Sequence, residues 1–255
     1  MQPEIDLFGI PIQTFGLMLA LGFLASGLVA QRNFKERGEP ADWAYEIIFA
    51  ALVGGIVGAR LWYLAEHLDE LRDDPIGSLL SGSGLTWYGG ALGGAACVLG
   101  WARWRGMPAL AAADLAAVPL AIGYAVGRIG CQLAGDGDYG EPWDGPWAMA
   151  YPDGTVPTDV PVHPTPIYET LTMGLVAYGL WQLRGRLRPG AVFATYLVLA
   201  GLERFLVEFV RRNEATVAGL STAQVFSLVL LAGGLGWLAA LRGRPGGLAA
   251  AAASR

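Results

Sequence analysis

Charged residues are scarce in this chain. Only 15% of its 255 residues are Asp, Glu, Lys or Arg, against about 25% in soluble domains, and 54% are hydrophobic. This composition predicts an integral membrane protein. The net charge of -5, with no basic tract, argues against nucleic-acid binding.

Cysteine and histidine are nearly absent as well. The two cysteines, Cys97 and Cys131, lie in apolar surroundings, so no disulfide framework is indicated. The two histidines, His67 and His163, are too few and too far apart for a recognisable metal motif. The sequence begins without the basic segment of a signal peptide, so we expect the first apolar segment to remain as a membrane span. We expect no metal.

Long apolar segments dominate the chain instead. A membrane span needs about 20 mostly apolar residues, and several segments approach that length. We expect an all-α integral membrane protein with one seven-helix transmembrane domain over residues 1–245. An extracytoplasmic loop at 135–165 and a disordered tail at 246–255 complete the expected organisation. The expected spans cover residues 10–30, 43–65, 85–104, 109–134, 166–183, 191–210 and 219–241.

Basic residues fall mainly on one side of these spans. With the N-terminus outside, eleven of the 17 Lys and Arg residues lie at cytoplasmic ends and three in outside loops. The other three, Arg60, Arg128 and Arg204, lie within spans. Positive charge collects on the cytoplasmic side of membrane proteins. The pattern therefore predicts an outside N-terminus and a cytoplasmic C-terminus, with the three span arginines in the outer half of the membrane.

Arginines inside apolar spans mark candidate functional sites. Each costs roughly 2.5–3.5 kcal/mol at mid-helix on insertion scales, so each needs an anionic partner. One interpretation is ion pairing within the bundle, for example between Arg204 and Glu208 at a spacing of four residues. The other is phosphate from a phospholipid head group, which the planar guanidinium binds bidentately. The acidic candidates for ion pairing are Asp114, Glu169, Glu203 and Glu208.

Glycines spaced four residues apart predict close helix packing. Gly54 and Gly58 form one such pair, and Gly89 and Gly93 form another. Gly89 and its neighbour Gly90 also lie near the outer end of the third span, where backbone could approach a ligand instead.

The segment Val162-His-Pro-Thr-Pro-Ile-Tyr-Glu169 opens the fifth span. Its prolines favour an extended approach to the helix, so His163, Tyr168 and Glu169 are expected to flank the entrance. A histidine can act as a general base near neutral pH, although a loop histidine is more often only solvated.

Ordered motifs along the chain resemble the prolipoprotein diacylglyceryl transferase family. The segment Gly127-Arg-Ile-Gly130, leading to Gly135-Asp and Gly140, is similar to the family signature. The match spans nearly the whole chain. Further blocks in the family's order are Phe15-Gly-Leu-Met, Gly58-Ala-Arg-Leu61, Trp87-Tyr-Gly-Gly90, His163-Pro-Thr-Pro-Ile-Tyr-Glu169 and Glu203-Arg-Phe-Leu-Val-Glu-Phe-Val-Arg211.

The resemblance implies a multi-pass enzyme of the bacterial cell inner membrane. Such enzymes transfer the diacylglyceryl group of phosphatidylglycerol to the lipobox cysteine of a prolipoprotein, forming a thioether and releasing glycerol phosphate. No cofactor is implied, and the partners would be phosphatidylglycerol, prolipoprotein signal peptides and membrane lipid. The alternatives are a related phospholipid-dependent transferase with another acceptor, and a non-catalytic lipid-binding or transport membrane protein.

The resemblance also implies roles for individual residues. Arg128 and Arg204 would hold the phosphate and stabilise its growing charge, with Glu208 orienting Arg204. The candidate catalytic residues are Arg128, Arg204, Tyr88, His163, Asp136 and Asp138. The candidate substrate-binding residues are Arg60, Gly89, Gly90, Gly127, Gly130, Cys131, Gly140, Tyr168, Glu169 and Glu208.

Several polar positions depart from the family pattern. Tyr88 stands where the family usually has histidine, so Tyr88, His163 and Asp138 are all candidates for the base. These departures indicate a divergent member or paralogue. The other departures are at Phe15, Cys131, Ala134, Asp136 and Ala200.

Overall fold

Long helices account for most of the computed structural model, which describes residues 1–7, 9–73, 77–78, 86–216 and 218–249. Four helices are long and apolar enough to cross a membrane: α1 (Thr14–Glu36), α2 (Trp43–Glu66), α6 (Ala109–Ala134) and α9 (Thr222–Arg242). The expectation of a helical protein with membrane-spanning segments is confirmed. The shorter or less apolar helices include α3 (Leu68–Asp73), α5 (Trp87–Trp104), α7 (Thr165–Leu183) and α8 (Ala191–Val207).

The first helix begins at Thr14, later than the expected start of the first span at residue 10. Residues Ile10–Gln13 form strand β2, which pairs antiparallel with β1 (Glu4–Leu7). Pro11 explains part of the difference, because proline is tolerated in an edge strand. Residue 85 of the third expected span lies outside the described residues.

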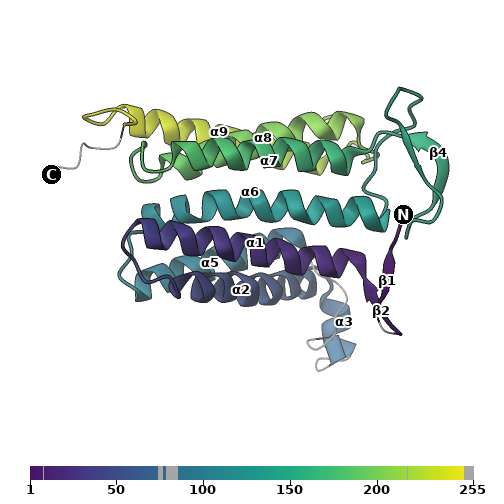
Figure 1. Ribbon diagram of the computed structural model, residues 1–255, viewed down its shortest axis with the longest axis horizontal. Helices are drawn as coiled ribbons and strands as arrows, with labels where there is room; N and C mark the ends of the chain where they lie inside the picture. Colours follow the sequence, from purple (N-terminus) through teal and green to yellow (C-terminus); the bar gives the residue numbers. More distant parts are fainter. Residues whose placement is uncertain (8, 74–76, 79–85, 217, 250–255) are drawn as a thin grey trace. The chain divides into compact units, whose positions relative to one another are not determined.

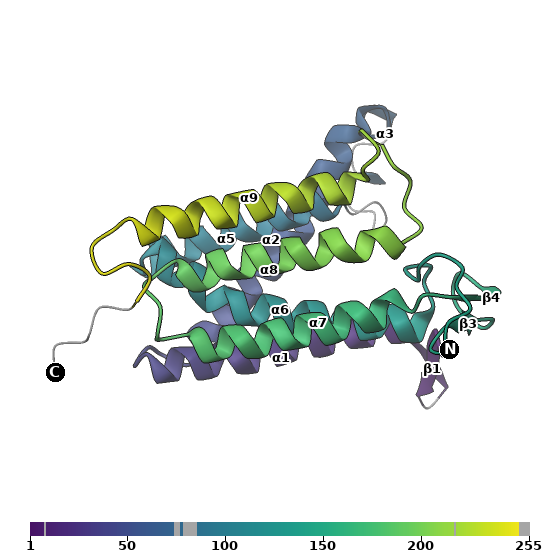
Figure 2. The ribbon, with the colours of Figure 1, turned by 90° about the horizontal axis from the view of Figure 1, so that it is seen from above.

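The chain divides into two units, which are described separately. The first unit comprises Met1–Val29 and Ala113–Arg255, and the second comprises Ala30–Ala112. In the first unit α8 packs against both α7 and α9. Figures 1 and 2 show these three helices running side by side.

The core of the first unit lies between α6, α7 and α8. Val118 of α6, Met173 and Leu180 of α7, and Val192 of α8 are buried together there. Small alanines on α6 let the neighbouring helices approach these side chains closely. The core therefore fixes the ends of α6, α7 and α8 with respect to one another.

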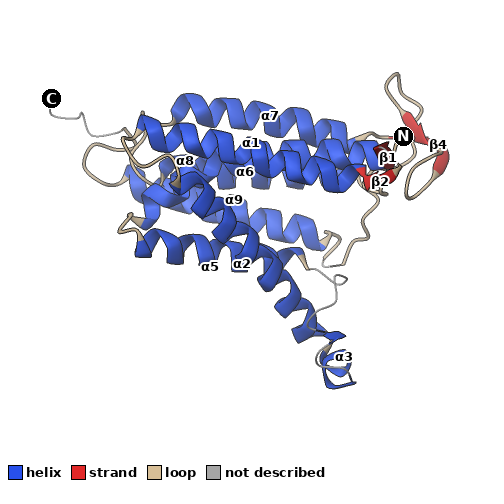
Figure 3. Cartoon of the chain, turned by 60° about the horizontal axis from the view of Figure 1, so that its bottom comes forward, coloured by secondary structure: helices blue, strands red, loops and turns tan. Residues whose placement is uncertain are grey.

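Strands gather at one end of the first unit, as Figure 3 shows in red. The loop expected at 135–165 carries β3 (Met149–Tyr151) and β4 (Thr158–Val162), which pair antiparallel. The N-terminal hairpin reaches the same end, because the Gln2 backbone N–H donates to the Leu133 carbonyl at 3.0 Å. Short strands thus surround the C-terminal end of α6.

The residues expected to form the tail begin in contact with the rest of the first unit. Ala249 forms an isolated β-bridge with Leu187, and an Arg188 guanidinium nitrogen donates to the Gly247 carbonyl at 2.8 Å. Residues 250–255 of the expected tail lie outside the described residues.

The second unit is organised by the glycines of α2 and α5. A Cβ atom added to Gly54 would lie 2.5 Å from the Gly93 carbonyl oxygen, and one added to Gly90 would lie 3.3 Å from the Gly55 carbonyl oxygen. At Gly54 a side chain would force the two backbones apart, and at Gly90 the contact would be tight. The packing interpretation of these glycines is confirmed.

Candidate functional site

Glu169 is the centre of a polar site in the first unit. Its side chain has no exposed surface, although it lies in the first turns of a helix otherwise rich in apolar residues. Arg128 and Arg204 approach one carboxylate oxygen at 3.2 and 3.5 Å, and Arg211 approaches the other at 3.3 Å. The Tyr124 hydroxyl donates to Glu169 at 2.7 Å. One buried carboxylate thus joins guanidinium groups from three parts of the chain.

Two further carboxylates complete this site. Asp138 contacts Arg128 through one oxygen and Arg211 through the other. Glu208 lies 2.8 Å from Arg204, so the structure contains the ion pair that their spacing allows. Three guanidinium groups therefore share three carboxylates. We call this set the arginine–carboxylate cluster: Arg128, Asp138, Glu169, Arg204, Glu208 and Arg211.

The end of α6 places two members of the cluster. Tyr124 and Arg128 lie one turn apart on one helix face, with the guanidinium 5.0 Å from the ring centroid. After the helix, Gly135 and Gly137 adopt φ values of +59° and +93°, which glycine tolerates and other residues rarely do. These two turns bring Asp138 back to Arg128.

Gly140 holds the following loop against the segment that carries Arg211. Gly140 and Arg211 form an isolated β-bridge, and the Gly140 N–H donates to the His163 carbonyl at 2.8 Å. A Cβ atom at residue 140 would collide with the Val210 carbonyl oxygen and would lie 2.9 Å from the His163 Cβ. The absence of a side chain at Gly140 therefore permits the approach that positions Arg211.

The electrostatic interactions within the cluster favour the charged forms of Asp138 and Arg211, the two members that lie in loops. Burial acts against ionisation of Asp138, but Arg128 and Arg211 outweigh that effect and hold its pKa below the usual range. Burial also acts to lower the pKa of Arg211, and Asp138 and Glu169 reverse the effect and raise it. The Asp138–Arg211 pair is therefore ionised at neutral pH.

His163 belongs to a separate aromatic group in the first unit. Its ring stacks on Trp143, with centroids 4.4 Å apart, and its Nδ1 lies 3.2 Å from the Tyr168 hydroxyl. The Trp147 indole N–H donates to the same hydroxyl at 2.7 Å. His163 and Tyr168 thus lie together at the start of α7, as their spacing suggested, and contact each other.

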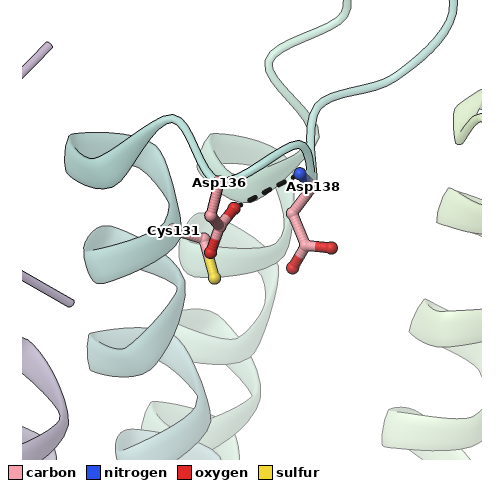
Figure 4. A group of neighbouring side chains, drawn as sticks. All are labelled: Cys131, Asp136 and Asp138. Atoms are coloured by element: carbon pink, nitrogen blue, oxygen red, sulfur yellow. Dashed lines mark hydrogen bonds between the residues drawn. The ribbon is translucent and has the colours of Figure 1, made fainter. Parts of the chain in front are cut away.

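Cys131 in the last turn of α6 lies close to Asp136 and Asp138, which follow the helix (Figure 4). Their potential ligand atoms are within 4.8 Å of one another, and Asp136 accepts a hydrogen bond from the Asp138 backbone at 3.2 Å. Both oxygens of Asp138, however, contact guanidinium groups, which a cation would have to displace. This donor set is therefore poorly suited to a metal ion.

Two glycines flank Arg128 on α6. A Cβ atom at Gly130 would lie 3.0 Å from the Met18 Cβ, so this glycine lets α1 pack against α6. A Cβ atom at Gly127 would meet no heavy atom within 4 Å. Packing accounts for Gly130 and leaves the space beside Gly127 open.

Four of the predicted site residues lie in the second unit. Arg60 is buried, and its Nε donates to the Ser78 carbonyl at 2.7 Å. Tyr88 packs edge-on against its neighbour Trp87, with ring centroids 5.5 Å apart. Gly89 and Gly90 serve the packing of α2 against α5.

Sequence reasoning missed Arg211 and Tyr124. Arg211 is one of the three basic residues assigned above to outside loops, whereas its side chain is 8% exposed and contacts three carboxylates, those of Asp138, Glu169 and Glu208. The spacing Glu208-x-x-Arg211 at the end of an apolar helix was the available signal, because residues three apart share a helix face. Tyr124 had a similar signal in its position four residues before Arg128.

Known proteins match most of the length of the chain. The sequence profile of the prolipoprotein diacylglyceryl transferase family matches residues 4–240. The chain belongs to this family. The resemblance predicted from the ordered motifs is therefore confirmed, and the apolar helices fit a multi-pass membrane protein.

Individual members of the family are about one-third identical to the chain. The phosphatidylglycerol–prolipoprotein diacylglyceryl transferase of Clostridium tetani is 33% identical over 232 residues, which cover 89% of this chain and 93% of that protein. The protein of the same name from Geobacter sulfurreducens is 34% identical over 232 residues, covering 86% of this chain and 87% of its own length. The phosphatidylglycerol–prolipoprotein diacylglyceryl transferase 2 of Clostridium perfringens is 30% identical over 236 residues, which cover 90% of this chain and 91% of that protein.

Proposed function

We propose that this protein transfers the diacylglyceryl group of phosphatidylglycerol to the lipobox cysteine of prolipoproteins. The names of its relatives describe this activity. The observation that carries the proposal for this chain is the arginine–carboxylate cluster. The Arg128 and Arg204 side chains are 16% and 23% exposed, so both remain partly accessible while their carboxylate partners hold the guanidinium groups in place.

The proposed location is the bacterial inner membrane, with the cluster in the outer half of the bilayer. The seven apolar segments support seven spans, and the placement of the basic residues supports an outside N-terminus and a cytoplasmic C-terminus. In this orientation α6 and α8 carry Arg128 and Arg204 near their outer ends. The head group of an outer-leaflet phospholipid and the lipobox of a membrane-inserted signal peptide would both be within reach.

The proposed reaction is a displacement at the glycerol carbon that bears the phosphate. The acceptor sulfur, once deprotonated, forms a bond to this carbon, and the carbon–oxygen bond to the phosphate breaks. The electron pair goes to the phosphate oxygen, so the departing glycerol phosphate gains negative charge. Arg128 and Arg204 stabilise that charge, since arginine can donate two parallel hydrogen bonds to phosphate oxygens.

The proposal is tested by complementation. The protein is expressed in a bacterial strain depleted of its own transferase, and conversion of a lipoprotein precursor is followed by gel shift. Arg128→Ala and Arg204→Ala should each lower turnover by about 10²–10³-fold, the usual loss for a group that stabilises transition-state charge. The matched control is Arg32→Gln, which removes an exposed arginine that pairs with Glu36 one turn along α1.

Each outcome has a defined meaning. If the wild-type protein is folded in the membrane and converts no precursor, the proposed acceptor is wrong. Lipid analysis of the same cells would then reveal a transferase with another acceptor, and native mass spectrometry would reveal phospholipid bound without turnover. If the wild type is active and both alanine variants retain full turnover, the phosphate role of Arg128 and Arg204 is wrong.

A further inference from the structure

Glu203 is a buried acid of α8 that the arginine–carboxylate cluster does not use. Its exposed fraction is 8%, and it directly precedes Arg204. The other buried acids in the described part of the chain, Asp114, Glu169 and Glu208, accept hydrogen bonds from backbone N–H groups or side chains. Glu203 forms no hydrogen bond or ion pair with any described residue. A buried carboxyl group in an apolar helix normally has a partner, so an unpartnered one indicates a functional role.

The Glu203 carboxyl group interacts electrostatically with members of the cluster, namely Glu169, Arg204, Arg128 and Arg211. Its two oxygens have no hydrogen-bond partner among the described residues, yet other atoms do not cover them completely, so they remain accessible. α9, which also packs against α8, contributes no charge near it, because Arg242 at the distant end is the only charged residue of that helix. The charged and titratable groups that interact with Glu203 are Tyr124, Arg128, Glu169, Tyr196, Arg204 and Arg211.

We infer that Glu203 is the group that accepts the proton of the acceptor thiol. This inference rests on the proposed function. The other candidates in the first unit have partners: both Asp138 oxygens contact guanidinium groups, Asp136 accepts the Asp138 backbone N–H at 3.2 Å, and the His163 Nδ1 lies 3.2 Å from the Tyr168 hydroxyl. Among these acids and bases, Glu203 alone has no hydrogen bond or ion pair with a described residue, and it directly precedes Arg204.

The proton transfer completes the balance of the reaction. The Glu203 carboxylate takes the proton from sulfur as the sulfur forms its bond to the glycerol carbon. The carbon–oxygen bond breaks, and its electron pair stays on the phosphate oxygen of the departing glycerol phosphate. The proton then passes from Glu203 to that phosphate or to the water that replaces it, which restores the carboxylate for the next turnover.

The test compares wild type with Glu203→Gln in phosphatidylglycerol vesicles, using a peptide that carries a lipobox cysteine. At pH 7 we expect the variant to be slower by about 10²–10⁴-fold, the usual contribution of general base catalysis. The deficit should shrink as the pH is raised to 9.5, because a thiol with a pKa of about 8.5 then ionises without help. Phosphatidylglycerol binding, measured by native mass spectrometry, should be unchanged. Glu214→Gln, which alters an exposed acid, is the matched control.

A second variant separates base catalysis from a structural role. Glu203→Ala should be inactive at pH 7 and regain turnover with added formate, a small carboxylate that can occupy the vacated space. The inference is overturned if Glu203→Gln matches wild type at pH 7. It is also overturned if the deficit is the same at every pH and formate restores nothing, or if phospholipid binding is lost instead of turnover. An inactive wild type would instead refute the proposed function.

Discussion

Replacing Glu169 by glutamine should destabilise the protein more than any other single charge removal in the cluster. Glu169→Gln keeps the size of the side chain and removes the charge shared by three guanidinium groups. The side chain is fully buried, and its three ion-pair distances lie between 3.2 and 3.5 Å. Removing one partner from a buried ion pair costs about 3–5 kcal/mol, because the remaining charge is left uncompensated. The amide would also present N–H donors to guanidinium groups that can only donate.

This cost is large enough to measure by thermal unfolding of the purified protein in detergent. A loss of 1 kcal/mol lowers Tm by about 2–4 °C for domains of this size, so Glu169→Gln should lower it by about 6–20 °C. The matched control is Glu36→Gln, which removes an exposed acid paired with Arg32 at 2.9 Å on the same helix. Such a pair contributes about 0.3–0.5 kcal/mol, so the control should unfold close to wild type.

A double variant shows whether uncompensated charge is the cause. Arg211→Gln combined with Glu169→Gln removes one charge of each sign, and it should cost less than the two single variants together. The expected coupling is about 0.5–3 kcal/mol, the range for residues within one ion-pair network. If Glu169→Gln unfolds at the temperature of the Glu36→Gln control, or if the double variant is additive, the account of a shared buried carboxylate is wrong.

Three further predictions concern the surroundings of the cluster. Asp138→Asn should lower the free energy of unfolding by about 1.5–3 kcal/mol at pH 7, the value of a hydrogen bond to a charged group. The folded-state pKa of Asp138 is lowered, so its carboxylate stabilises the folded protein fully above about pH 5. In unfolding titrations the difference between wild type and variant should disappear as the pH falls below about 4. Gly140→Ala should lower the free energy of unfolding by about 1–3 kcal/mol through overpacking and should also reduce turnover. The control is Gly174→Ala, because a Cβ there meets no atom within 4 Å. This control should be neutral or slightly stabilising in the same assays. Asp114→Asn should lower the free energy of unfolding by about 1–2 kcal/mol, because Asp114 accepts the Gly190 N–H at 2.8 Å at the start of α8. Turnover per folded molecule should stay at the wild-type level. A selective loss of turnover would contradict a purely structural role for Asp114.

Sequence periodicity and charge predicted the helices well because their signals are local. Long apolar runs located α1, α2, α6 and α9. The spacing of Arg204 and Glu208 offered their ion pair as one interpretation, and the structure contains this pair. Spaced glycines likewise predicted the close contact of α2 and α5. In each case the interacting residues are either near in sequence or repeat at a helical period, so the physical cause is visible without the fold.

The arrangement around Glu169 could not be predicted in the same way, since its contacts join distant parts of the chain. Arg128 and Arg211 reach it from segments 41 and 42 residues away. The turn that returns Asp138 to Arg128 depends on glycines whose left-handed conformation no periodicity reveals. Sequence reasoning identified Glu169 as one of several possible acids, and only the fold distinguishes it as the shared partner.

The charge balance of the cluster constrains the proposed reaction. Three guanidinium groups are already matched by three carboxylates, so a phospholipid phosphate must bind to remaining N–H donors, of which each arginine has five. As the ester breaks, the phosphate gains a second negative charge in a poorly solvated site, where uncompensated charge is costly. Proton transfer to Glu203 removes one negative charge from the same site at the same step. The total charge around the arginines therefore stays constant during the displacement, which a base placed farther from the phosphate could not achieve.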